Sequence, residues 1–440
     1  MKSMMSSFAL ISFLVAAIAI AQSTVNFQAQ ENGTRYGNLP RYRVTDLGTL
    51  PDGSGAFDAA WWVNNGGLSV GVVTLTDGTY HGVVWNKGVT TDLGTPGLGG
   101  TNSWAFGVNN MATPNGYAET DTLDPNGEDF CGFGTYLICL GFVWQNGAMI
   151  SLPTLGGNNG ESMRINNRGD IAGYTENSTP DPDCPAPQVL QFKPVIWEKG
   201  QAHELPTFDG DREGFAWGIS DEGEAVGASG TCAPFNNDGL YLLEAHALYW
   251  QNGTVTDLGN LGGTGGMGVL GNAAYSVNNR GDVVGHSDLS GDTATHAFLW
   301  TKRTGIQDLG TLPGDLLSYA ADINDFGEIV GASVDSSGNY RAVVWERGQP
   351  VELNTLIVSG GDAGLFLAAA YSINERGEIV GWGLTSGGDI HAYLAKPVRA
   401  EAGGMILSQG RNMKPPVLSI QARERLRSSG RLGARFMAPR

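Results

Sequence analysis

Basic side chains are scarce in this 440-residue chain. Lys and Arg together number 26 against 44 Asp and Glu, which gives a formal net charge of −18 at pH 7. Proteins that bind nucleic acid or anionic membranes use clustered basic residues to neutralise phosphate groups. The shortage therefore argues against nucleic acid and against an anionic membrane as the main partner.

Long apolar runs are also scarce, with one exception at the N-terminus. Lys2 precedes an apolar run of 14 residues, Phe8 to Ala21, and Ala19-Ile20-Ala21 has the A-x-A pattern of a cleavage site. A membrane span needs about 20 apolar residues, so this run is too short. We expect residues 1–21 to be a signal peptide and residues 22–40 a linker. The mature protein is then secreted, extracellular or periplasmic, with no transmembrane segment.

The short motifs of several enzyme classes are missing. The chain has no Walker phosphate loop, no H-E-x-x-H and no C-x-x-C. These absences exclude the commonest signatures of nucleotide hydrolases, zinc proteases and thiol oxidoreductases. A glycosidase-type pair of carboxylates has no short motif and stays open.

The basic residues that are present gather at the C-terminus. Residues 398–440 hold nine Lys and Arg against two Glu, a net charge of +7, which leaves −25 for the rest of the chain. This segment contains Pro415-Pro416 and shows no apolar periodicity, so we expect a disordered extension rather than a domain. An electrostatic tether is the alternative.

Glycine is abundant, at 66 residues, and much of it belongs to a repeated nine-residue phrase. The phrase "INDFGEIVG" (323–331) recurs, with variation, at residues 63–71, 108–116, 165–173, 219–227, 277–285 and 373–381. A period of this length indicates a solenoid, a propeller or an array. Each copy is expected to be a β-hairpin, strands A and B, whose turn glycine is left-handed.

Two further strands follow each hairpin. Strand C ends in tryptophan in six of the seven repeats, and strand D carries a "TDLG"-like phrase. We expect these tryptophans in the core rather than in a ligand-stacking role. The phrase's final glycine lies within strand B, where glycine is unusual, and is expected to make room for the tryptophan ring. The six tryptophans are Trp85, Trp144, Trp197, Trp250, Trp300 and Trp345.

The ends of the repeat region predict how the fold closes. One extra strand D, "YRVTDLG" (Tyr42–Gly48), precedes the first hairpin, and the seventh repeat stops after its strand C at residues 391–397. The counts match if the N-terminal strand completes the last blade, pairing around His391–Leu394 and leaving no open edge. The sequence therefore predicts an all-β fold over residues 41–397, a seven-bladed β-propeller of four-stranded antiparallel blades.

Three phrases that recur in fixed order carry a resemblance. His296-Ala297-Phe298, "IND-x-G-x-I-V-G" and "DLGTLPG" (308–314) resemble the HAF repeat of probable extracellular bacterial proteins, over residues 42 to about 397. The resemblance implies export and a repetitive β-fold, and it offers no catalytic residues. The second repeat departs most, with Ala112 at the turn glycine and Pro114 in strand B.

Two polar positions also recur from blade to blade. Four histidines open strand C and are expected to bond a backbone carbonyl, because a metal site would require ligands that converge. An acidic residue follows the turn glycine in five repeats, as a solvated turn charge or, alternatively, as part of a carboxylate ring. The histidines are His81, His246, His296 and His391, and the acids are Asp170, Glu224, Asp282, Glu328 and Glu378.

Insertions break the sevenfold pattern. They lie between strands B and C of repeats two, three and four, at residues 119–140, 175–193 and 229–245. Up-and-down strand order places them on one face together with the loop Phe208–Gly214. This face supplies the candidate ligand-binding residues Asp121, Asp124, Glu128, Asp129, Asp209, Asp211 and Arg212. Such oxygen-rich loops can hold calcium, but the spacing departs from a calcium-loop motif, so we expect no cofactor and keep calcium as the alternative.

Four cysteines in an exported chain indicate disulfides, and three pairings are possible. Cys131 and Cys139 flank a short segment of one insertion, while Cys184 and Cys232 lie in the insertions of adjacent repeats. We predict the pairs Cys131–Cys139 and Cys184–Cys232, with free buried thiols as the alternative.

A single asymmetric partner is best recognised by the asymmetric face. We therefore predict a secreted, non-catalytic, monomeric binding module whose partner is an extracellular protein or a glycan. The alternatives are a structural cell-surface component and a hydrolase or lyase that acts on polysaccharide, which would require a pocket of titratable groups.

Overall fold

The computed structural model describes residues 39–398 apart from 236–238, 266–270 and 359, together with Pro416. The predicted signal peptide, nearly all of the linker and the basic tail after Val398 lie outside the described residues. The described part contains one helical turn, η1 (Leu353–Leu356), and no helix in it has the length and apolarity needed to cross a membrane.

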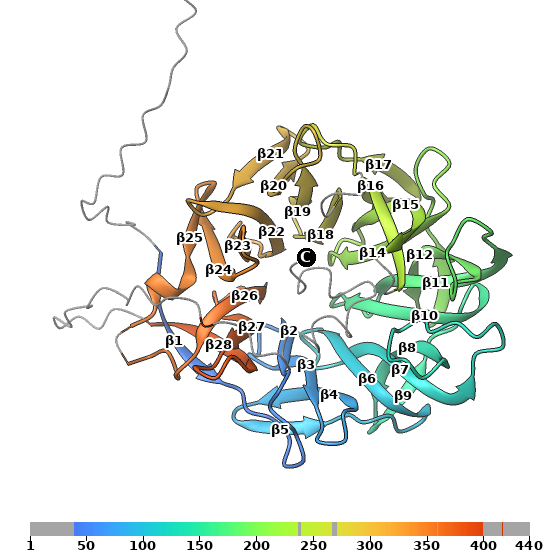
Figure 1. Ribbon diagram of the computed structural model, residues 1–440, viewed down its shortest axis with the longest axis horizontal. Helices are drawn as coiled ribbons and strands as arrows, with labels where there is room; N and C mark the ends of the chain where they lie inside the picture. Colours follow the sequence, from blue (N-terminus) through green and yellow to red (C-terminus); the bar gives the residue numbers. More distant parts are fainter. Residues whose placement is uncertain (1–38, 236–238, 266–270, 359, 399–415, 417–440) are drawn as a thin grey trace, which may run out of the picture. The chain divides into compact units, whose positions relative to one another are not determined.

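The strands form seven four-stranded antiparallel sheets, or blades, around one ring (Figure 1). Blades I and II hold β2 (Ala59–Val63), β3 (Ser69–Thr74), β4 (Tyr80–Asn86), β5 (Val89–Asp92), β6 (Gly99–Val108), β7 (Pro114–Leu123), β8 (Leu137–Gln145) and β9 (Ala148–Ser151). Blades III and IV hold β10 (Gly156–Ile165), β11 (Ile171–Pro180), β12 (Leu190–Glu198), β13 (Gln201–Glu204), β14 (Glu213–Ile219), β15 (Ala225–Phe235), β16 (Gly239–Gln251) and β17 (Thr254–Asp257). Blades V and VI hold β18 (Ala273–Val277), β19 (Val283–Asp288), β20 (Thr295–Thr301), β21 (Gly305–Gly310), β22 (Asp315–Ile323), β23 (Ile329–Asp335), β24 (Tyr340–Glu346) and β25 (Gln349–Glu352). Blade VII combines β26 (Phe366–Ile373), β27 (Ile379–Leu384) and β28 (Ile390–Val398) with β1 (Arg41–Asp46), which confirms the predicted fold.

The N-terminal strand closes the ring. β1 pairs antiparallel with β28, with Arg41 opposite Val398 and Asp46 opposite Tyr393. The Tyr42 and Val44 side chains are 1% and 5% exposed and pack in a cluster with residues of blades VI and VII. The predicted closure is therefore present, and β28 does not end the sheet as an open edge.

The repeated phrase folds as the predicted hairpin. In blade VI, Gly327 is left-handed (φ 82°), its N–H donates to the Asn324 carbonyl at 3.0 Å, and the Asn324 side chain accepts the N–H of Glu328 at 3.0 Å. Blade II keeps this turn although it lacks the glycine, because Ala112 adopts a φ of 61°. The turn is therefore specified mainly by its asparagine, whose side chain mimics a backbone turn.

The final glycine of the phrase faces a β-bulge rather than a tryptophan ring. In blade VI, Gly331 lies opposite Ala320, and the pairing then skips Ala321. A Cβ on Gly331 would lie 2.0 Å from the Tyr319 carbonyl oxygen. The equivalent glycines of all seven blades meet a strand A carbonyl at 1.9–2.2 Å, and a tryptophan is a comparably close neighbour only for Gly71 and Gly173. The expectation about the tryptophan was therefore wrong as a general explanation: the bulge bends strand A against strand B, and only glycine fits.

Four of the repeated tryptophans also join neighbouring blades. Trp85, Trp197, Trp250 and Trp345 are buried, as predicted, whereas Trp144 and Trp300 are only partly buried at the edge of the core. Each indole N–H donates to a carbonyl at or after strand D of the preceding blade, for example from Trp197 to Pro153 at 2.7 Å and from Trp345 to Leu309 at 2.9 Å. In blade I, the acceptor is Gly48, just after β1, at 3.0 Å. The rings thus fill the space between blades and fix their spacing.

The insertions are mostly longer strands and not loops. In blade II, β7 ends at Leu123 and β8 starts at Leu137, so the ends of the predicted insertion are strand and residues 124–136, more than half of it, are a loop. In blade III, β11 runs to Pro180 and β12 starts at Leu190, and blade IV has the two longest strands, β15 and β16. The expectation of irregular insertions is corrected to three hairpins that project beyond the other blades.

Candidate functional site: the insertion face

Several candidate ligand-binding residues join the blade II and blade III hairpins instead of facing solvent. Glu128 is fully buried, and its Oε1 accepts the N–H of Leu190 at 2.9 Å and the side-chain amide of Gln188 at 3.1 Å. The same Gln188 amide donates to Glu176 at 2.7 Å. Asp124 is buried and accepts from the Asn159 amide at 2.9 Å. These carboxylates hold two hairpins together and are not available to a ligand.

The oxygen atoms predicted as possible calcium ligands also accept hydrogen bonds from within the protein. Asp124 Oδ1 accepts the N–H groups of Asn126 and Glu128 at 2.7 and 3.1 Å, and Asp129 Oδ1 accepts the N–H of Gly134 at 3.0 Å. Asp121 remains exposed, with a local bond to Thr122. Among the described residues, the one group with metal-site spacing is Cys184, Glu213 and Cys232, and its two cysteines form a disulfide. The geometry therefore gives the calcium alternative no support here.

The blade III and blade IV hairpins are joined by an ion pair and a disulfide. Arg212 Nη1 lies 2.8 Å from Asp181 and 2.6 Å from Asp183, and the Lys193 ammonium donates to the Arg212 carbonyl. Both predicted disulfides are present, Cys131–Cys139 within the blade II hairpin and Cys184–Cys232 between blades III and IV. The three hairpins therefore form one crosslinked surface, which we call the insertion face.

The remaining candidates in the loop before blade IV have separate roles. Asp211 accepts the hydroxyl of Ser229 at 2.6 Å and lies 2.8 Å from His246 Nδ1. Asp209 is exposed in a left-handed turn (φ 45°). Asp211 is therefore structural, and of the seven predicted residues Asp121, Asp209 and Arg212 are the ones that reach solvent.

The repeated histidines bond carboxylates, which corrects the expected backbone carbonyl. In three blades, the histidine of strand C lies against the aspartate of strand D, and in blade IV the partner is Asp211. The Nδ1–oxygen distances are 3.0 Å for His81–Asp92, 2.9 Å for His296–Asp308, 2.7 Å for His391–Asp46 and 2.8 Å for His246–Asp211. The pairs in blades I, V and VII tie the two outer strands of a blade, the pair in blade IV ties strand C to the loop before strand A, and the four pairs do not converge on a metal site.

One pair of carboxylates has widely separated proton affinities. Burial, together with hydrogen bonding to Asp181, raises the pKa of Glu213 to about 9. Burial alone would raise the pKa of Asp181, but hydrogen bonds from Glu213 and the Asp183 backbone and the charge of Arg212 hold it below its ordinary value. Such a split is typical of an acid and a base in a catalytic pair. Glu213 is fully buried, however, so the pair does not reach a substrate and serves to hold the hairpins together.

Buried acids of this kind make stability depend on pH. Burial raises the pKa of Glu161 and Glu176 to about 8, and that of Glu213 to about 9. Because these groups keep a proton in the folded state that the unfolded chain releases near pH 4.5, the free energy of unfolding falls as pH rises toward 9. We expect the melting temperature to decrease from about pH 5 to about pH 9, and to do so less steeply in Glu213→Gln. A melting temperature that rises over this interval would contradict the assignment.

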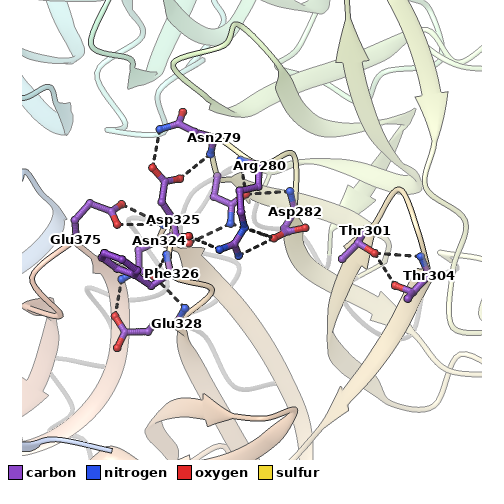
Figure 2. A network of polar contacts seen from close by, with 11 residues as sticks. Asn279, Arg280, Asp282, Thr301, Thr304, Asn324, Asp325, Phe326, Glu328 and Glu375 are labelled. Carbon is purple, nitrogen blue, oxygen red and sulfur yellow. Dashed lines mark hydrogen bonds and ion pairs between the residues drawn. The ribbon is translucent and has the colours of Figure 1, made fainter.

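The opposite face is formed by the A–B turns and is held by a circular belt of hydrogen bonds. In each blade, the N–H of the residue after the turn asparagine or serine donates to the side chain of its counterpart in the next blade. Figure 2 shows two links, from Asn279 to Asp325 at 2.8 Å and from Asp325 to Glu375 at 3.1 Å. The link from Glu375 to Asn65, at 3.0 Å, closes the belt between blades VII and I. The belt members are Asn65, Asn110, Asn167, Asp221, Asn279, Asp325 and Glu375.

The acids that follow the turn glycines sit beside this belt as local pairs and form no separate ring. Asp170 and Asp282 each lie 2.8 Å from the arginine two residues before them, and Glu378 is paired with Arg376 in the same way. Glu328 accepts the side-chain amide of Asn324 at 2.6 Å (Figure 2). The expectation of solvated turn charges is therefore wrong for Glu224 and Glu378, which are buried and paired with Lys302 and Arg376, while Asp170, Asp282 and Glu328 are half-buried.

A polar depression of ≈120 Å³ lies inside the belt, lined by turn residues of all seven blades. On its lining, Arg164 reaches across the channel to Asp322 at 3.2 Å and lies 3.6 Å from the ring centre of Trp62. Sequence reasoning missed these three residues. They occupy the strand A position directly after the bulge, where the other blades have glycine or serine, and an alignment of the seven repeats would have singled them out.

The solvent side of the insertion face carries exposed apolar side chains. Leu123 is 68% exposed and Tyr136 is 47% exposed, both at the end of the blade II hairpin. Pro125, Pro180 and Pro182 are exposed on the blade II and III hairpins, and Asp121 and Asp183 add charge. The face therefore presents rigid apolar groups beside carboxylates.

No protein-family model matches the chain, and no curated protein matches it either. Solved structures that are similar include the β-propeller domain of the Trilobed protease from Pyrococcus furiosus, at 9% identity and a TM-score of 0.45, covering 83% of this chain and 100% of that one. A chain of the Mitotic Checkpoint Complex, at 11% identity and a TM-score of 0.42, covers 90% and 99%, and YCF48 bound to D1 peptide, at 10% and 0.41, covers 83% and 98%. These identities are too low to indicate a shared function, and the chain is similar to these proteins as a β-propeller.

Proposed function

We propose that this chain is an exported binding module of the HAF-repeat type, which holds a protein partner on its insertion face without catalysis. The observation that carries the proposal is the crosslinked surface built from the blade II, III and IV hairpins. Export rests on the N-terminal leader pattern and agrees with the two disulfides, which form in oxidising compartments.

Rigidity supports a role in recognition. The blade II and III hairpins are joined through Glu128, and blades III and IV through Arg212 and the Cys184–Cys232 disulfide. A surface whose segments are already fixed loses less conformational entropy when a partner binds. The hairpins are also confined to three adjacent blades, so the face is asymmetric, as recognition of one asymmetric partner requires.

The exposed groups favour a protein over a glycan. Leu123 and Tyr136 offer an aliphatic and an aromatic contact, and aromatic anchors with apolar neighbours are typical of the centre of protein interfaces. A glycan site would instead need polar groups around exposed rings. The exposed Asp121, on a chain of net charge −18, favours a partner with a basic rim, whereas the charge of Asp183 is paired with Arg212.

The proposal is tested by screening the purified chain against immobilised extracellular proteins and, in parallel, a glycan array. For any partner found, Leu123→Asp should weaken binding at least about tenfold, because it places a charge in the contact. The matched control is Phe326→Asp on the A–B turn face, since Phe326 is 72% exposed and should tolerate the change. Glycan hits without protein hits, or equal loss in both variants, would contradict the proposal.

Deleting the tips of the blade II and III hairpins would affect folding as well as binding. Shortening residues 121–129 and 180–187 would remove Asp124, Glu128 and Asp181, whose buried carboxylates hold neighbouring hairpins. Such a deletion is expected to destabilise the fold as well as to affect binding. Single changes at exposed positions therefore separate binding from folding better than a deletion does.

A further inference from the structure

The bulges of strand A build a small aromatic cavity on the axis of the propeller. In every blade the pairing of strands A and B skips one residue, and all seven skipped residues line the same cavity of ≈50 Å³. It lies beneath the polar depression of the A–B turn face, with which it shares Arg164. The skipped residues are Trp61, Phe106, Met163, Trp217, Tyr275, Ala321 and Tyr371.

Two donors in the cavity wall have no acceptor. Trp61 and Trp217 are 5% and 7% exposed, and within the described part of the chain neither indole Nε1–H has a hydrogen-bond partner. A buried donor without an acceptor costs about 1–3 kcal/mol. Both residues line the cavity, which makes the cavity the candidate position for an acceptor.

The charge of the cavity wall is already balanced. Arg164 donates to Asp322 at 3.2 Å and to the Ala321 carbonyl at 3.3 Å. Asp322 is fixed in turn by the Ser276 hydroxyl at 2.6 Å and the N–H of Ile373 at 2.9 Å. A carboxylate ligand would leave a net negative charge in a low-dielectric site, below a belt that contains three acids, and this is costly. The cavity is therefore suited to a neutral acceptor.

The size and the walls specify that acceptor further. A volume of ≈50 Å³ accommodates about four water-sized groups. The lining is aromatic and aliphatic apart from the two indole donors, Arg164 and the tyrosine hydroxyls, and it includes no carboxylate. A carbonyl oxygen beside a methyl group satisfies both features, with the oxygen on the indole N–H groups and the methyl against the rings.

We propose that the cavity binds the acetamido group of an N-acetylhexosamine, with the sugar ring in the polar depression above it. The acetamido group has four heavy atoms, is neutral and places a carbonyl beside a methyl. The depression of ≈120 Å³ is rimmed by amide and carboxylate oxygens of the belt, which can accept further bonds from sugar hydroxyls. This site lies on the face opposite the insertion face and does not depend on the function proposed above.

The test follows the tryptophan indole N–H signals by nuclear magnetic resonance while ligands are added to the whole chain. N-acetylglucosamine and acetamide should shift two indole signals in a saturable way, while glucose, glucosamine and propionate should not. Trp217→Phe removes the indole donor and keeps a smaller aromatic ring in the wall, so it should weaken N-acetylglucosamine binding about tenfold. The control is Trp104→Phe, because Trp104 also has a buried, unpartnered N–H but does not line the cavity.

Each other outcome overturns a stated part of the proposal. If neither acetamide nor N-acetylglucosamine binds and the two indole protons exchange with water, the cavity holds only water. If propionate binds better than acetamide, the neutral acceptor is wrong. If acetamide and acetyl-lysine bind but N-acetylglucosamine does not, the sugar assignment is wrong. The ligand series uses the unaltered chain, so it decides the question even if Trp217→Phe does not fold.

Discussion

Tyr42→Ala is expected to lower the free energy of unfolding by about 3–5 kcal/mol, the usual cost of removing a large buried ring. Tyr42 is 1% exposed in β1, and its carbonyl accepts the N–H of Val358 at 2.9 Å. The ring packs between blade VI and blade VII, where it helps to hold the closing strand. The measurement is urea-induced unfolding followed by tryptophan fluorescence.

The neighbouring residue gives the control. Arg43 is exposed on the same strand, so Arg43→Ala should change the stability by less than about 0.5 kcal/mol. Deletion of residues 22–48 should have the largest effect, because it exposes the edge of β28 and promotes aggregation. If Tyr42→Ala and Arg43→Ala have equal, small effects, β1 does not close the ring in solution.

Loss of the disulfide between blades III and IV should be the second large effect. The double change Cys184→Ser and Cys232→Ser opens a loop with a sequence separation of 48 residues. On the chain-entropy account, such a loop contributes about 4 kcal/mol through the unfolded state. We expect that loss in urea unfolding, together with weaker binding at the insertion face.

The second disulfide serves as the comparison. Cys131 and Cys139 are separated by eight residues, so Cys131→Ser with Cys139→Ser should cost about 2–3 kcal/mol. Peptide mapping without reductant should find these two pairs alone. A chain with free thiols, or one in which the short loop matters more than the long one, would contradict the assignment.

The fold could be predicted from the sequence because the same four-strand pattern recurs seven times. The Asn–x–x–Gly turn of five copies, and its variants with Ala112 and Ser220 in the other two, fixes a hairpin, and the tryptophan of strand C marks the next strand in six repeats. The displaced strand at Tyr42–Gly48 then indicates circular closure, and its pairing with β28 is observed. The other six copies allow the hairpin of the second repeat to be recognised although Ala112 replaces the turn glycine.

The reason for the glycine of strand B could not be predicted from the sequence. The sequence shows that Gly331 is required, but the obstacle is the Tyr319 carbonyl of a bulged strand, and backbone geometry of this kind leaves no residue signature. The same bulges place Trp61 and Trp217 on the axis, so the channel cavity was also missed. Its residues look like ordinary hydrophobic core positions in the sequence.

The sequence indicated which insertions carry the candidate residues, but not what those residues contact. Acidic residues gather on the insertions, as expected, but Glu128 accepts from Leu190 across 62 positions of sequence. A carboxylate that is buried against another blade cannot be told from a solvent-facing one by its local sequence. The two disulfides were predictable because cysteine has few possible partners, whereas a carboxylate has many.

The central claim is that the insertion face, and not the A–B turn face, holds the partner. Hydrogen–deuterium exchange of the chain with and without a bound protein partner tests it most directly. We predict slower exchange in peptides that cover residues 119–140 and 175–193, and unchanged exchange in the turns at residues 323–331 and 373–381. Protection confined to those turns would contradict the account.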